Sequence, residues 1–212
     1  MTTTQRSTLS RPALLLGALA AATLMSACAP LLVGGAVVGT SMVVTDRRTS
    51  GTQLEDQSIE LKAKTRVREA VGERGHVNIT SFNRTVLLTG EVAADVDKVA
   101  VEQAVAKIEG VRTVVNELAV MGSSSIASRS NDAVLTSKVK ASYIDAKDVF
   151  ANAIKVVTER GTVYLMGRVT EREANRASDI ARGVSGVQKV VKVFEVITEA
   201  ELAEIQPKQA QK

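Results

Sequence analysis

The feature that most constrains this chain is an internal repeat. The segment Thr85–Val92 reads TVLLTGEV, and Thr162–Val169 reads TVYLMGRV. Both copies alternate β-branched or aliphatic residues with others, place a glycine at the sixth position, and follow it with a valine two residues later. Self-similarity of this kind indicates that one small module occurs twice. We therefore expect two similar domains in tandem.

Each module contains the same order of helical and strand patterns. The first helix is expected after Asp56 in one copy and after Asn131-Asp132 in the other, because apolar residues then recur three and four positions apart. The polar residues before each helix are N-cap candidates. Two alternating strands, a second helix and a last strand come next. The expected strands and second helices are 77–81, 85–91, 94–109 and 113–120 in the first copy, and 154–158, 162–168, 171–184 and 189–197 in the second.

The order α-β-β-α-β predicts an α+β fold for each module. A hairpin followed by a helical crossover gives a three-stranded mixed sheet, and the two helices can cover its apolar face. Gly90 and Gly167 are expected where the backbone bulges or passes close to another segment. Modules of about 65 residues bury limited apolar area. Docking of one module on the other would therefore stabilise both.

The first 27 residues have the pattern of an export signal. Arg6 and Arg11 precede an apolar stretch, and Ser26-Ala27 supply small residues directly before Cys28. Because Cys28 is the only cysteine, it cannot form an internal disulfide. Its position predicts attachment of diacylglycerol and acylation of the new N-terminus, with an unmodified thiol as the alternative. Several acyl chains would hold the protein stably on a bilayer.

The apolar segment 31–44 is shorter than the roughly 20 residues needed to span a membrane, so we expect it to be part of a tether. The charged and turn-forming residues 46–51 then indicate a linker. The expected divisions are a signal peptide (1–27), a lipidated tether (28–54), the first module (55–121), a linker (122–130), the second module (131–198) and a polar, frayed tail (199–212).

The composition argues against several function classes. Aromatic residues make up 2% of the chain, so platforms for stacking nucleic-acid bases are lacking. The net charge of +4 falls to +2 once Arg6 and Arg11 are removed, which leaves little general basicity. His76 is the only histidine and is expected in a surface loop. Asp95 and Asp97 are expected at the start of the second helix, where they would cap it and complement its dipole. We therefore expect no enzyme, catalytic residue, cofactor, metal site, small-molecule substrate or nucleic-acid partner.

Both repeats resemble the BON domain of bacterial envelope proteins. The residues that carry the resemblance are Val86, Leu88, Gly90 and Val92 with Gly110-Val111, and Val163, Leu165, Gly167 and Val169 with Gly186-Val187. Segments 45–48 and 169–174 are also similar to lipoproteins with two BON domains. The resemblance implies a non-enzymatic lipoprotein, anchored by palmitate-type acyl chains on the periplasmic face of the outer membrane. It further implies a contribution to outer-membrane integrity, stress response and cell division.

The resemblance also implies a binding surface. In the family, the first helix of the second BON domain binds anionic phospholipids, phosphatidylglycerol and cardiolipin. Carried onto this sequence, the phospholipid-binding residues are Val134, Leu135, Lys138, Lys140, Ala141, Tyr143 and Ile144. Val134 stands where the family has a tryptophan. In the alternative interpretation Leu135, Val139 and Tyr143 pack on the sheet and the lysines are only solvated.

Two other functions stay open from the sequence. One is an envelope scaffold that binds a protein partner such as the outer-membrane barrel-assembly machinery. The other is a soluble periplasmic stress-response chaperone, which requires that Cys28 remain unmodified.

Overall fold

The computed structural model describes residues 46–72, 74–146 and 148–205. The expected signal peptide, Cys28 and the apolar segment 31–44 lie outside the described residues. The described residues all belong to one compact unit, Val43–Lys212. Among them, no helix has both the length and the apolar character needed to cross a bilayer.

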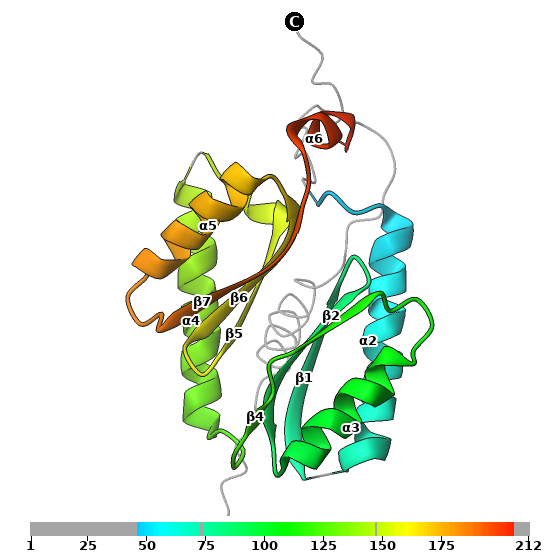
Figure 1. Ribbon diagram of the computed structural model, residues 1–212. Coiled ribbons are helices and arrows are strands. Elements are labelled where there is room, and N and C mark those ends of the chain that lie inside the picture. The colour runs from blue at the N-terminus through cyan, green and yellow to red at the C-terminus, as the bar shows by residue number, and fades with distance from the viewer. Residues whose placement is uncertain (1–45, 73, 147, 206–212) are drawn as a thin grey trace, which may run out of the picture. The chain divides into compact units, whose positions relative to one another are not determined.

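The first module consists of helix α2 (Ser50–Val71), strands β1 (Gly75–Phe82) and β2 (Thr85–Val92), helix α3 (Asp95–Ala106) and the short strands β3 (Thr113–Asn116) and β4 (Ala119–Val120). Strand β2 pairs antiparallel with β1 and parallel with β3 and β4. Both helices cover the same face of this sheet (Figure 1). The core between them is aliphatic and includes Ile59, Ala63, Val86, Leu88 and Val101.

The second module repeats this plan. It contains helix α4 (Ile126–Asp145), a 3-10 turn (Ala151–Ala153), strands β5 (Ile154–Glu159) and β6 (Thr162–Val169), helix α5 (Glu171–Gly183) and strand β7 (Lys189–Val196). Strand β6 pairs antiparallel with β5 and parallel with β7. The predicted α+β class, with two α-β-β-α-β modules and mixed sheets, is confirmed.

The first helix of each module begins earlier than predicted. Helix α2 is capped by Thr49 and α4 by Ser125. Asp56 and Asp132, expected as N-caps, are buried inside these helices and serve a different purpose. The carboxylate of Asp132 accepts hydrogen bonds from the backbone N–H groups of Arg160 and Gly161, both at 2.8 Å.

Asp56 does the same in the first module, where it accepts from the backbone N–H groups of Asn83 at 2.8 Å and Arg84 at 2.9 Å. Asn83 and Arg84, like Arg160 and Gly161, have positive φ, as in the two-residue turns that suit twisted hairpins. Each buried carboxylate therefore fixes the hairpin turn of its own module against the first helix. This long-range partner is why a local capping rule misplaced the helix starts.

In the second helix of the first module, the capping part of the prediction for Asp95 and Asp97 is wrong, whereas the dipole part agrees with their position. The N-cap position of α3 is Ala94, whose side chain makes no capping bond, and Asp95 and Asp97 lie in the first turn. Asp97 instead pairs with Arg74, 3.1 Å away. Both acids still face the positive end of the helix dipole, which favours their charge.

Gly90 and Gly167 lie where two strands approach closely, as predicted. A Cβ atom on Gly90 would fall 2.0 Å from the backbone oxygen of His76, and one on Gly167 would fall 2.5 Å from that of Ala153. Gly90 also has a φ of +106°, which disfavours any other residue. The repeated glycine is therefore required by the sheet itself.

The sheet faces that do not contact the helices are apolar as well. Phe82 and Leu87 of the first module form one buried cluster with Tyr164 and Met166 of the second. Lys155 and Glu60 add an ion pair of 3.1 Å between the modules, and the Asn83 amide donates to Glu195. The docking expected from the small size of each module is thus present.

Two segments expected to be loosely held are packed against the modules. Residues 46–49, which we call the N-terminal strap, bind both modules through Arg47 and Arg48. Arg48 pairs with Asp56 at 2.9 Å and lies over the ring of Phe82. Residues 199–205, expected as a frayed tail, form helix α6 (Glu199–Ile205), because Leu202 is buried and Thr198 bonds to Glu201.

Candidate membrane-contact site

Helix α4 has an inward and an outward face. With about 100° of rotation per residue, Leu135, Val139 and Tyr143 fall on the side that packs on the sheet, and all three are buried. Val134 and Ile144 fall on the opposite side, where they are 55% and 73% exposed. These two aliphatic side chains therefore point away from the core of their module.

Leu135 and Tyr143 must be removed from the predicted contact residues. The Tyr143 hydroxyl donates to the backbone oxygen of Ala177 at 3.0 Å, and burial raises its pKa far above the ordinary value. Leu135 packs beside Gly186, where an added Cβ would lie 3.3 Å from its side chain. Neither side chain can reach a bilayer while the module is folded, so the packing alternative is right for both.

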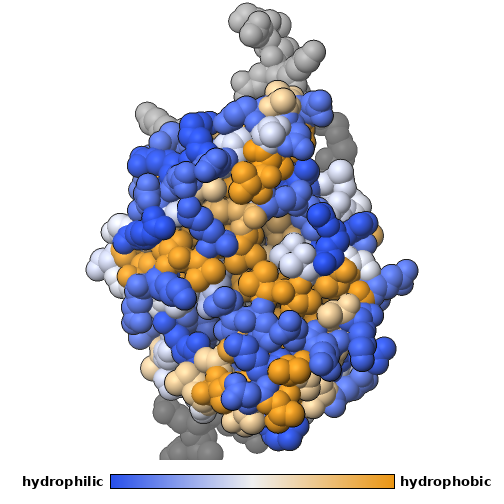
Figure 2. All heavy atoms as spheres, in the orientation of Figure 1, coloured by the Kyte–Doolittle hydropathy of each residue, from blue (hydrophilic) through white to orange (hydrophobic). Residues whose placement is uncertain are grey.

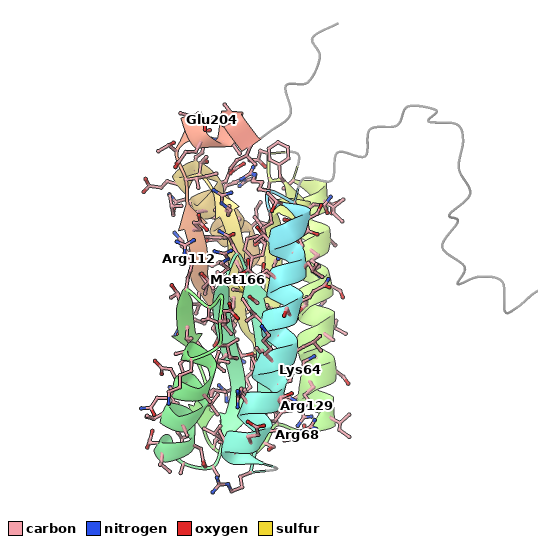
Figure 3. All side chains as sticks on the ribbon, turned by 90° about the vertical axis from the view of Figure 1, so that its right-hand side faces the viewer. Lys64, Arg68, Arg112, Arg129, Met166 and Glu204 are labelled. Atoms are coloured by element: carbon pink, nitrogen blue, oxygen red, sulfur yellow. The ribbon has the colours of Figure 1, made fainter. Side chains whose placement is uncertain are left out.

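The remaining predicted residues share the outward side. Lys138, Lys140 and Ala141 are all exposed, and the two lysines flank the line from Val134 to Ile144. Arg129, near the beginning of the helix, is exposed too and bonds only to Ser124 among the described side chains (Figure 3). The only acids of α4 are Asp132, which is buried, and Asp145 at the last position. An apolar line edged by cations therefore covers most of this helix.

Ile126 extends the line by two turns and was missed from the sequence. It is more exposed than Val134 or Ile144 and lies on the same side of the helix. The expected helix began at residue 131, which left Ile126 in a linker. The run Ser123-Ser124-Ser125 directly before it is an N-cap signal that could have located the true start.

A groove runs beside the outward face. It lies between α4, the turn at Gly161 and the loop at Ser185-Gly186, and its α4 side includes Asp132 and Leu135 as well as Val134 and Lys138. Its lining is mixed, because aliphatic and polar side chains, the Lys138 ammonium group and the Asp132 carboxylate all contribute to it.

The first helix of the other module provides a comparison. Helix α2 also exposes two leucines, Leu54 and Leu61, and Figure 3 places Lys64 and Arg68 further along it. Its acids, however, include Glu55, Glu60 and Glu69, so the first half of the helix is acidic and its basic residues lie from Lys62 onward. On the face seen in Figure 2, apolar side chains form a band across the middle of the molecule, with hydrophilic residues above and below it. Helix α4 differs from α2 in that no exposed acidic residue of the helix lies between Ile126 and Ile144.

Comparison with known proteins supports the assignment of both modules. The sequence model described as "BON domain" matches residues 56–122 and 131–198. The outer membrane lipoprotein DolP of Haemophilus influenzae is 41% identical over 90% of this chain and 98% of its own length.

Two further relatives are more distant. The 21 kDa hemolysin of Actinobacillus pleuropneumoniae is 29% identical over 72% of this chain and 79% of that protein. The osmotically inducible protein Y of Escherichia coli is 26% identical over 66% of this chain and 72% of that protein. The chain therefore belongs to the BON-domain family and, within it, to the outer membrane lipoproteins of the DolP type.

Proposed function

We propose that this lipoprotein binds anionic phospholipids, phosphatidylglycerol and cardiolipin, through the outward face of α4. The contact residues are Ile126, Val134, Lys138, Lys140, Ala141 and Ile144. The observation that carries the proposal is the separation on this helix, where aliphatic and cationic side chains face solvent while Leu135, Val139 and Tyr143 form the core. Binding of this kind would support outer-membrane integrity and concentrate the protein at the division site.

The expected affinity of the helix alone is modest. Complete burial of a valine or isoleucine side chain contributes roughly 1.5–3 kcal/mol, and Val134 and Ile144 are already partly covered. Lys138 and Lys140 would each contribute about 1 kcal/mol near an anionic surface. Val134 also lacks the amphipathic ring of the tryptophan found in relatives, which favours the membrane interface. The proposed acyl anchor on Cys28 compensates, because tethering raises the local concentration of membrane around the helix.

Vesicle co-sedimentation of the unlipidated fragment 43–212 tests the proposal. We expect binding to phosphatidylglycerol vesicles at low salt, little binding to phosphatidylcholine, and a decrease with ionic strength as charges are screened. The pair Val134→Glu and Ile144→Asp should reduce binding at least tenfold. The matched control is Leu54→Glu with Leu61→Asp, which places the same charges on α2 and should leave binding intact.

The control also separates the rival functions. If the α2 pair reduces binding as much as the α4 pair, the contact is not specific to the second module. If neither fragment nor full chain binds anionic vesicles, a scaffold that binds a protein partner becomes the better explanation. Labelling with radioactive palmitate, lost in Cys28→Ser, tests the anchor, and an unlabelled chain would favour a soluble periplasmic protein.

A further inference from the structure

One polar cluster lies away from α4 and is unrelated to the proposed lipid contact. His76 and Glu91 are paired residues on the neighbouring strands β1 and β2, and Glu159 is the last residue of β5 in the other module. One imidazole nitrogen and one oxygen of each carboxylate all lie within 4.8 Å of one another. His76 was expected in a surface loop, but it belongs to strand β1 and faces these two acids.

The two carboxylates of this cluster are buried, His76 is partly buried, and the three groups are incompletely paired. Glu91 and Glu159 are 0% and 3% exposed. Nδ1 of His76 is buried and has no hydrogen-bond partner among the described residues. It lies 3.7 Å from Oε2 of Glu91, which is too long for a hydrogen bond.

The protein supplies little positive charge here. Glu91 accepts from the backbone N–H of Ser124 at 3.1 Å, and the nearest atom of Arg160 is 3.5 Å away. Glu159 accepts from the neutral amide of Asn78 at 2.8 Å. Glu91 thus has one guanidinium at 3.5 Å, and the bond to Glu159 comes from a neutral amide, although a buried charge is costly unless it is closely paired.

Tyr164 reports the same negative surroundings. Burial is the largest cause that raises its pKa to about 12, and the charges of Glu117 and Glu159 raise it further, against an opposing effect of Arg160. Of the three residues of the cluster, Glu159 contributes to this shift, so a cation beside it would offset part of the negative charge near Tyr164.

We propose that His76, Glu91 and Glu159 bind one divalent transition-metal ion, Zn²⁺ in the first instance. One imidazole nitrogen with two carboxylate oxygens suits Zn²⁺, whereas Ca²⁺ and Mg²⁺ prefer oxygen ligands alone. Ligand bonds of about 2.0–2.2 Å place the ligand atoms of a tetrahedral site roughly 3.4 Å apart. The separation of 3.7 Å between His76 and Glu91 is close to this value, and small rotations of Glu159 would complete the set.

The site would join the two modules. His76 and Glu91 come from the first module and Glu159 from the second, so a bound ion would link them directly. His76 and Glu159 also line a surface groove, which offers the ion an entry path and a water molecule as a further ligand; Asn78, Thr158, Asp132 and the cation Arg129 belong to the polar part of its lining. The ion would act as a structural staple, because nothing in this arrangement requires it to do chemistry.

The test uses the full chain without a polyhistidine tag, extracted in a nonionic detergent and stripped with EDTA. After equilibration with Zn²⁺ and removal of excess ion, we expect one zinc per chain by mass spectrometry and a higher midpoint of thermal unfolding than in the stripped protein. His76→Ala and Glu159→Gln should each weaken zinc binding at least tenfold. Glu60→Gln, which removes a different carboxylate between the modules, should retain it.

A variant that gains a spectroscopic signal distinguishes loss of metal binding from loss of folding. His76→Cys supplies a thiolate at the same position, and with Co²⁺ it should produce a sulfur-to-metal charge-transfer band that is absent from the Glu60→Gln control. Absence of zinc from the natural chain overturns the proposal. So does zinc binding that is unchanged in both His76→Ala and Glu159→Gln.

Discussion

The N-terminal strap makes a strong prediction about stability through Arg47. Its guanidinium donates to both carboxylate oxygens of Glu173, each at 2.7 Å, and to the backbone oxygen of Arg168 at 2.7 Å. The side chains of Arg47 and Glu173 are only 3% and 4% exposed. Arg47→Met keeps much of the side-chain volume but leaves the Glu173 carboxylate buried without its counter-ion.

The expected loss follows from that burial. Removing one partner of a buried ion pair costs about 3–5 kcal/mol, chiefly because the remaining charge is uncompensated. In a unit of this size each 1 kcal/mol lowers the unfolding midpoint by roughly 2–4 °C, so we expect a decrease of about 6–20 °C. Arg66→Met provides the control, because Arg66 and Glu69 pair at 3.1 Å but are 63% and 59% exposed. Its expected cost is below about 1 kcal/mol.

Urea unfolding followed by circular dichroism measures both free energies. The double variant Arg47→Met with Glu173→Leu should recover most of the loss, because neither charge then remains buried. Some deficit should persist, since Glu173 also accepts from the backbone N–H of Thr170 in a capping box. The reasoning fails if Arg47→Met costs no more than the Arg66→Met control, or if the double variant is less stable than the single one.

Three further outcomes follow from individual contacts. Gly90→Ala should lower the free energy of unfolding by about 2 kcal/mol or more, because the added Cβ would collide with the His76 backbone oxygen. Gly122→Ala is the control: an added Cβ there has no neighbour within 4 Å, so it should be nearly neutral in the same urea titration. Tyr143→Phe should cost about 1 kcal/mol by removing the buried bond to the Ala177 oxygen, and a cost near zero would contradict that bond. Burial would raise the pKa of Glu173, but the bonds from Arg47 and Thr170 outweigh it and hold this pKa below its ordinary value of 4.5. Its contribution to stability is therefore complete above about pH 4.5 and lost as the pH falls through the folded-state pKa, so the difference in stability between the natural chain and Arg47→Met should be largest near neutral pH and shrink in acid.

Periodicity predicted most of the fold because the responsible interactions are local. Alternation located both hairpins to within two residues, and the glycine of each repeat correctly marked a close contact of strands. The helix starts were wrong where a polar residue has a distant partner. Asp56 looks like an N-cap, yet its carboxylate meets backbone groups of a hairpin 27 and 28 positions away.

The sequence also predicted which side of helix α4 faces solvent. Helical spacing separated Leu135, Val139 and Tyr143 from Val134 and Ile144, and the structure keeps that division. The family resemblance did not distinguish the two faces, because it assigned Leu135 and Tyr143 to the lipid contact as well. Burial decides the matter, since a side chain in the core cannot also insert into a bilayer.

The differences between the two repeats indicate which residues serve the junction of the modules. Asp56 and Asp132 each accept hydrogen bonds from the hairpin turn of their own module, so this buried carboxylate is a feature of the module itself. The strand register aligns His76 with Ala153 and Glu91 with Arg168, because Gly90 pairs with Val77 and Gly167 pairs with Ile154. The cluster of His76 and Glu91 therefore has no counterpart in the second copy.

Arg47 is likewise used once, since a single strap reaches Glu173 of the second module. Features needed by each module are duplicated with it, whereas features that join the modules occur singly and combine residues from both. Substitutions of Asp56 or Asp132 should thus destabilise their own module, and substitutions of Arg47 or His76 should act on the link between the two.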